Sequence, residues 1–284
     1  MSVDTRGNLF AGVLFFLASP LLADPIQFGE TSTVGEGSVS SYVRFDGAGD
    51  VNSYGIKLTG DALNGLSQGP PPELHAHVDM PVGVSGIPVE FVDIHFLPGG
   101  HIGGPGNNYW LVPHFDFHFF VQPMAATATF TDETTGFNPL PDSYVPAGYI
   151  LAPDSFVAGE GVHWVNPAEF GGPYTTNFIY GSYAGEMTFL EPMEALSFLE
   201  AMRAGTEGDF SGAIGTADSY QKTGLYPSEY SISYDAGEDA FYIEMSNLSQ
   251  GHPVPEPSTA VLAVLGFAVT TLVYRRQGRC RRRR

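Results

Sequence analysis

The chain has 284 residues, one cysteine and a formal net charge of −19. Most of its basic residues lie in the last ten positions, so residues 24–256 carry 4 basic and 30 acidic residues, a net charge of −26. A surface this acidic repels nucleic acid and favours cations, which excludes a nucleic-acid-binding role. The only cysteine, Cys280, lies outside this region, which excludes disulfides and cysteine catalysis there.

The N-terminus has the pattern of a secretory signal peptide. Arg6 precedes an apolar run at residues 9–18, and small residues and turn formers follow up to Ala23. We expect a signal peptide at residues 1–23 and therefore an exported protein. A short core helix is the alternative interpretation of the apolar run.

Residues 24–249 contain short stretches of alternating polarity, separated by turns rich in glycine and proline. Such stretches are typical of strands. We predict one mainly β domain, an antiparallel β-barrel or sandwich with one or two short helices. The expected strands are residues 38–45, 53–59, 89–97, 110–121, 126–130, 177–183, 186–190, 231–234 and 240–245.

One helix is predicted after the strand at residues 186–190. Pro192 would occupy its first position, apolar residues recur at helical spacing up to Met202, and Gly205 would end it. Glu191 would then lie at the helix N-terminus. An acid there interacts favourably with the helix dipole, so Glu191 has an ordinary structural explanation beside a role as ligand.

All eight histidines lie between residues 75 and 252. In the densest block, residues 114–119, a histidine or aspartate alternates with phenylalanine. Because successive side chains of a strand point to opposite faces, the phenylalanines would pack in a core, and His114, Asp116 and His118 would share the other face. Alternate residues lie about 6.5–7 Å apart, so these three side chains need help from another strand to bind one ion.

Other histidines and acids could supply that help. Asp93 and His95 alternate onto one face, and His75 and His77 form a His-x-His pair, while Asp116 could instead orient an imidazole from behind. Three interpretations stay open: a metal site, histidines that are solvated or hydrogen-bonded on a polar face, and metal-free acid–base catalysis. Neither a Gly-x-Ser-x-Gly elbow nor a phosphate-binding glycine loop is present in the sequence.

Four blocks of the core occur in an order that resembles a known domain. They are His101, the Pro-His-Phe-Asp-Phe-His-Phe of residues 113–119, the Gly-Val-His-Trp-Val-Asn-Pro of residues 161–167, and the stretch from Tyr180-Gly181 through the Glu-Pro-Met of residues 191–193. Residues 70–205 resemble an uncharacterised bacterial domain family of exported or hypothetical proteins, typed by a Thermus hypothetical protein. The resemblance implies a shared β-rich domain, but it implies no activity for this chain.

The same resemblance indicates a set of site residues: His101, His114, His118, His163 and Glu191. Histidines with a carboxylate suit Zn²⁺, or Fe²⁺ or Mn²⁺ with water in the open positions. The alternative for His163 is an aromatic pair with Trp164. Asn166 stands where an aspartate is more usual in the family.

The C-terminus combines three parts in order. A stalk at residues 250–259 contains Pro255-Glu256-Pro257, residues 260–274 are uncharged and about 22 Å long as a helix, and residues 275–284 carry seven arginines. We expect a short transmembrane helix with a cytoplasmic Arg-rich tail. An ordinary membrane anchor would have a similar helix.

This C-terminus resembles the PEP-CTERM sorting signal, in which an exosortase cuts near the Pro-Glu-Pro. The resemblance implies a Gram-negative bacterium that makes exopolysaccharide. It also implies a precursor anchored in the inner membrane and a mature protein in the cell envelope or outside the cell. It says nothing about the activity of the exported domain.

We therefore predict an exported envelope or extracellular protein with a His-rich metal site. The alternative is a non-catalytic matrix module that associates with exopolysaccharide. Whether the chain is an enzyme stays open, because a metal-dependent hydrolase, lyase or cyclase would need a site with a bound water.

Overall fold

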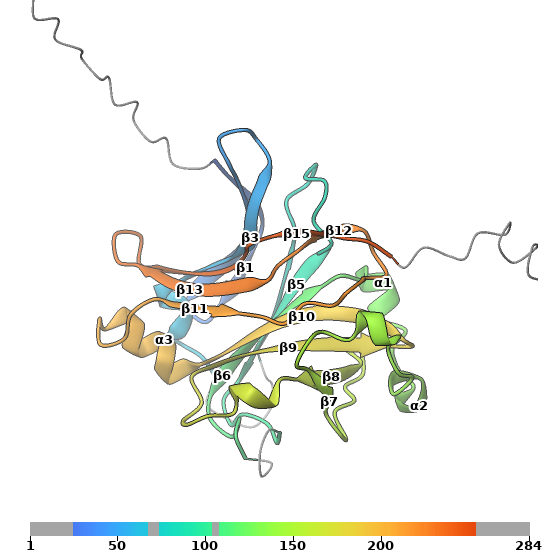
Figure 1. The fold of residues 1–284 in the computed structure, drawn as a ribbon. Helices are drawn as coiled ribbons and strands as arrows, with labels where there is room; N and C mark the ends of the chain where they lie inside the picture. The colour runs from blue at the N-terminus through green and yellow to red at the C-terminus, as the bar shows by residue number, and fades with distance from the viewer. Residues whose placement is uncertain (1–24, 68–73, 104–107, 254–284) are drawn as a thin grey trace, which may run out of the picture.

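The computed structural model describes residues 25–67, 74–103 and 108–253, in which antiparallel strands dominate (Figure 1). Sheet A has the strand order β1-β2-β3-β14-β13-β11, sheet B has the order β4-β5-β6-β10-β9-β8-β7, and β12 pairs with β15. Sheet A consists of β1 (Ile26–Val34), β2 (Gly37–Phe45), β3 (Val51–Thr59), β14 (Ala240–Ser246), β13 (Glu229–Asp235) and β11 (Phe210–Ala213). Sheet B consists of β4 (Leu74–Asp79), β5 (Phe91–Leu97), β6 (His114–Phe120), β10 (Glu186–Ala195), β9 (Thr176–Tyr183), β8 (Val162–Val165) and β7 (Ile150–Leu151). The small pair is β12 (Gly224–Tyr226) with β15 (Ser249–Gly251).

Helices are few and short. They are α1 (Met124–Thr127), α2 (Glu133–Gly136) and α3 (Leu196–Arg203), with 3-10 turns η1 (Gly60–Leu63), η3 (Asp142–Tyr144) and η4 (Pro167–Glu169). The prediction of a mainly β, antiparallel fold with few short helices is confirmed. Within the described ranges, no helix has the length and apolarity to cross a membrane. Residues 1–23, the motif at 255–257 and residues 260–284 lie outside these ranges, so the signal peptide, the sorting motif and the membrane helix stay predictions.

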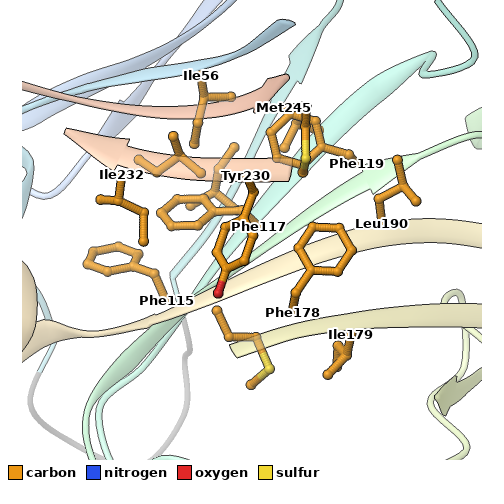
Figure 2. Packing of buried hydrophobic residues seen from close by; sticks show 14 of the residues in the cluster. Ile56, Phe115, Phe117, Phe119, Phe178, Ile179, Leu190, Tyr230, Ile232 and Met245 are labelled. Carbon is orange, nitrogen blue, oxygen red and sulfur yellow. The ribbon is translucent and has the colours of Figure 1, made fainter. Parts of the chain in front are cut away.

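Sheets A and B pack face to face through their apolar sides. Phe115, Phe117 and Phe119 of β6 are fully buried and lie in one cluster with Ile56 of β3 and Met245 of β14 (Figure 2). Burying each such phenylalanine contributes about 1.5–3 kcal/mol. No ladder joins the two sheets in the part of the chain that the structure describes, so the arrangement is a sandwich and not a closed barrel.

Most expected strands are present with small changes at their ends, and two expectations are wrong. Residues 110–113 lie outside β6, and residues 126–130 form the end of α1 and the turn after it. The hydroxyls of Thr127 and Thr129 donate to the carbonyls of Met124 and Ala126 at 3.0 and 2.7 Å. These local bonds favour a turn over pairing with another strand.

The predicted start of the helix at Pro192 is also wrong. β10 continues through Pro192 to Ala195, and α3 begins only at Leu196. The pairing of β10 with β6 includes Leu190 and Met193 but neither of the two residues between them. Because proline has no N–H to donate, it is tolerated where a ladder is interrupted. Glu191 therefore lies in a central strand and not at a helix N-terminus.

Candidate metal centre

The outer face of sheet B, opposite the phenylalanine core, carries the predicted histidines. His118 lies opposite Asp93 of β5, and Asp116 lies opposite His95. The register of β10 on β6, in which Leu190 faces Phe119 and Met193 faces Asp116, places Glu191 opposite His118. Since opposed residues of antiparallel strands project to the same side, β5, β6 and β10 present imidazoles and carboxylates together.

His118 is the central residue of one group of donor atoms. Its Nε2 lies 3.3 Å from Glu191 Oε1 and 3.6 Å from Glu160 Oε2, and His163 Nε2 lies 3.4 Å from the same Glu160 oxygen. His95 Nδ1 lies 3.6 Å from the other Glu160 oxygen. We call these five residues centre 1. His95, His118 and Glu160, and likewise His118, His163 and Glu191, offer ligand atoms that all lie within 4.8 Å of one another.

The distances in centre 1 fit ligands around an ion better than hydrogen bonds. Two ligands that each lie about 2.0–2.1 Å from one Zn²⁺ at the tetrahedral angle are about 3.3–3.4 Å apart. A charge-assisted hydrogen bond between the same atoms would be about 2.7–2.9 Å long. The contacts from His118 and His163 to the carboxylates are longer than this. Moreover, His118 Nδ1 and Glu191 Oε2 are buried without a hydrogen-bond partner.

His163 is held in the orientation that a ligand needs. It lies on β8 opposite Gly181, and its Nδ1 lies 2.7 Å from the Ser155 carbonyl. The ring therefore donates Nδ1–H to that carbonyl, which leaves Nε2 as the acceptor that faces Glu160. Histidines that bind metals commonly donate their second N–H in this way. The proposed aromatic pair with Trp164 is not formed, because the Trp164 indole donates to Ser182 Oγ at 2.8 Å on the other side of the strand.

Glu160 was missed in the sequence, because it lies in a loop and not on a strand. A tight turn between Val157 and Gly161, closed by hydrogen bonds of 2.8 and 2.9 Å, presents its side chain to sheet B. Gly161 has φ 108°, and a Cβ there would lie 2.3 Å from the Ser182 carbonyl oxygen, so only glycine fits. The available signal was a glutamate between two glycines, three residues before His163.

Opposite charges face one another in centre 1. Burial acts to lower the pKa of His118, but the carboxylates of Glu191 and Glu160 outweigh it and raise this pKa to about 10. Burial raises the pKa of Glu191 to about 7, although His118 opposes the shift. Burial and the nearby His118 lower the pKa of His95 to about 3. Burial acts to raise the pKa of Glu160, but His118 and His163 hold it well below its usual range. A site that binds a proton this tightly attracts a cation.

The remaining predicted residues separate into two further groups. His101 and His114 do not reach centre 1 but lie with Asp116 in a second cluster. His77 contacts Asp93 at 2.8 Å and Asp79 at 3.1 Å and belongs to a more exposed group with Glu30. The His75 ring lies 4.1 Å from that of His95 and is exposed. Asn166 accepts from the Ala168 N–H at 3.1 Å as the cap of η4.

Comparison with protein-family models, curated proteins and solved structures finds no match for this chain. Any proposal about function therefore rests on the donor atoms of the site itself. A surface hollow of about 300 Å³ is lined by Leu63, Asn64, Glu200, Arg203 and Ala204, none of which belongs to centre 1. Centre 1 is a packed set of side chains, which suits an ion rather than an organic substrate.

Proposed function

We propose that this protein binds a divalent transition-metal ion in centre 1, with His118, His163 and Glu191 as ligands and Glu160 and His95 beside them. The single observation that supports this most is the convergence of the ligand atoms at the spacing of a coordination shell. The fixed Nε2 of His163 adds to it, because the ring is held by a backbone carbonyl before any ion arrives.

Charge balance supports the same proposal. Glu160 and Glu191 have side chains that are 13% and 2% exposed, and His118 is 2% exposed. Burying two carboxylates is unfavourable unless positive charge compensates them. One divalent ion neutralises both, and neutral imidazoles complete the shell. Without an ion, His118 and His163, whose pKa values the carboxylates raise, would both have to be protonated to compensate them.

The donor atoms narrow the choice of ion. Mixed imidazole and carboxylate ligands suit Zn²⁺, Fe²⁺ and Mn²⁺, whereas Cu⁺ prefers sulfur ligands. None of the five residues of centre 1 supplies sulfur. We therefore propose Zn²⁺, Fe²⁺ or Mn²⁺.

Metal analysis of the full chain, purified in detergent without chelators, tests this proposal. We expect at least about one equivalent of metal, and about one equivalent less in His163→Ala. His252→Ala is the matched control, since His252 is exposed and remote in sequence from centre 1. Metal below about a tenth of an equivalent, with a melting temperature that neither zinc nor EDTA changes, would overturn it.

The cellular setting forms a second part of the proposal. We infer that an exosortase processes the precursor at Pro255-Glu256-Pro257, so that the metal-binding domain reaches the envelope or the exopolysaccharide layer. The order of motif, apolar run and arginine cluster supports this. Mass spectrometry of the mature protein from its host should find a C-terminus near residue 257. A C-terminus that still carries Arg284 in a host with an active exosortase would contradict it.

A further inference from the structure

A second group of ligand atoms lies near centre 1 on the outer side of sheet B. His114 Nε2 lies 3.1 Å from Asp116 Oδ1, and His101 Nε2 lies 3.7 Å from Asp116 Oδ2. Each of the three residues offers a ligand atom within 4.8 Å of the other two. We call these residues centre 2. It shares no residue with centre 1.

Both imidazoles of centre 2 are oriented by the backbone. His114 Nδ1 lies 2.7 Å from the Val112 carbonyl, and His101 Nδ1 lies 3.1 Å from the Ile102 carbonyl. Each ring therefore donates Nδ1–H and keeps the lone pair of Nε2 directed at Asp116. Three histidines of the protein, these two and His163, thus share an arrangement that metal ligands commonly have.

Buried atoms of centre 2 lack hydrogen-bond partners. His114 is fully buried and Asp116 is 5% exposed, and neither His114 Nε2 nor Asp116 Oδ1 has a hydrogen-bond partner in the structure. Leaving such buried atoms unpaired is unfavourable. Their 3.1 Å separation is close to the edge of an octahedral shell, about 3.0 Å for ligands that lie 2.1 Å from the ion. An ion between them would satisfy both atoms.

Aromatic side chains enclose centre 2 on one side and leave it accessible at another. The Trp110 ring lies 5.4 Å from that of His101, and the Tyr174 ring lies 5.7 Å from that of His114. Trp110 is fixed in turn, because its indole donates to Asn177 Oδ1 at 2.9 Å. His101, by contrast, has a side chain that is 36% exposed. Solvent therefore reaches this end of the group.

We propose that His101, His114 and Asp116 bind a second divalent cation, separate from the ion of centre 1, with open coordination positions on the side of His101. Centre 1 surrounds its ion with as many as five buried or nearly buried residues, which is typical of a structural site. Three protein ligands and a solvent-facing side are typical of sites that keep a water or take up a small anion. The ion of centre 2 is thus the one that exchanges with solvent, and its ligands include no residue of centre 1.

Titration of the chelator-stripped full chain with Co²⁺ tests the second site. We expect about two equivalents to bind to the unsubstituted protein and to His252→Ala, and about one to bind to His114→Ala and to His163→Ala. Added azide should change the visible spectrum of the Co²⁺ protein and of His163→Ala but not that of His114→Ala, because only centre 2 is open. Circular dichroism checks that each variant is folded, and His101→Ala, at a partly exposed position, replaces His114→Ala if the latter is not.

Each outcome separates the two sites. If the unsubstituted protein binds one equivalent, which is lost in His163→Ala and kept in His114→Ala, centre 2 is overturned and centre 1 is supported. One equivalent that only His114→Ala loses would overturn centre 1 and support centre 2. Two equivalents in His114→Ala and His101→Ala, or an azide response that survives in both, would overturn the second site, and no binding at all would overturn both.

Discussion

The two faces of β6 differ in what their burial requires. On one face Phe115, Phe117 and Phe119 pack against sheet A (Figure 2), and their burial is favourable by itself. On the other face His114, Asp116 and His118 are just as deeply buried. Burial of charged groups is favourable only when partners compensate it, so this face depends on neighbours from other strands and loops.

One strand can thus serve stability and chemistry at once. The apolar face needs only the right volume, which many residue combinations provide. The polar face needs particular atoms at particular distances. Substitutions on the first face should therefore act on folding alone, and substitutions on the second should act through the ion.

The largest effect is expected from Phe117→Ala. The ring is fully buried between the sheets, so its removal should lower the free energy of unfolding by about 3–5 kcal/mol. Urea denaturation with EDTA and with zinc measures it, and the loss should be the same in both. A loss that depends on metal would mean that the two faces are coupled.

Removal of metal should have the next largest effect. Zinc at about a hundredfold excess over its dissociation constant stabilises a protein by ~2.7 kcal/mol per site. We expect EDTA to lower the melting temperature and zinc to restore it, with a smaller restoration in His163→Ala. Equal restoration in His163→Ala would show that centre 1 does not bind the ion.

Gly181→Ala probes the packing around centre 1 on the outer face, where Phe189 clusters with Phe91 and Phe120. A Cβ at Gly181 would lie 2.1 Å from the Phe189 ring, which itself lies 4.8 Å from the ring of His118 and 5.4 Å from that of His163. Moving this ring should destabilise the protein by about 1–3 kcal/mol and weaken zinc binding. Calorimetry measures both, with Gly171→Ala as the control, since a Cβ there meets no atom within 4 Å. Unchanged zinc affinity would show that Phe189 does not position the ligands.

The last effect, which vanishes at low pH, concerns a carboxyl group on the apolar face. Glu194 pairs with Phe115 and is fully buried, and burial, with the charges of Asp116 and Glu191, raises its pKa well above the usual range. In the unfolded chain its pKa is about 4.3, so from that pH upward only the unfolded state loses the proton. Stability therefore falls as pH rises, by at most about 1.4 kcal/mol per pH unit, until the folded-state pKa is reached.

Glu194→Gln removes this dependence. We expect the variant to be more stable than the unsubstituted protein at pH 7, by up to about 1.4 kcal/mol for each pH unit above the unfolded-state pKa, with the difference gone near pH 4. Urea denaturation across this range measures it, and Glu200→Gln, at an exposed position, is the control. A variant that is less stable at pH 7 would mean that Glu194 is ionised and paired in the folded protein.

Strand alternation predicted much of this molecule. The separation of phenylalanines from histidines on β6 followed from the period of two, because successive side chains point to opposite faces even in a strand that is buried on both sides. The same period placed Asp93 and His95 on the outer face, where they lie. The period of two could not give the pairing between strands. That pairing places Glu191 beside His118 and not beside His114.

The sequence pattern could not predict two other features. Pro192 fits a helix start as well as a gap in a ladder, and only the pairing of β10 on both sides selects the strand. Glu160 comes from a turn, where no periodicity exists. Local patterns therefore located the candidate ligands, and long-range pairing divided them between two centres.

The turn that carries Glu160 also has a consequence for the order of folding. Glu160 and His163 are close in sequence, but His95, His118 and Glu191 are distant from one another along the chain, and they meet only after β5, β6, β10 and β8 have joined one sheet. Bringing such separated segments together is the slow part of building a β protein. An ion that needs all of them cannot act as the nucleus. It would enter a chain that is already paired, so metal uptake would slow unfolding and leave the rate of folding nearly unchanged.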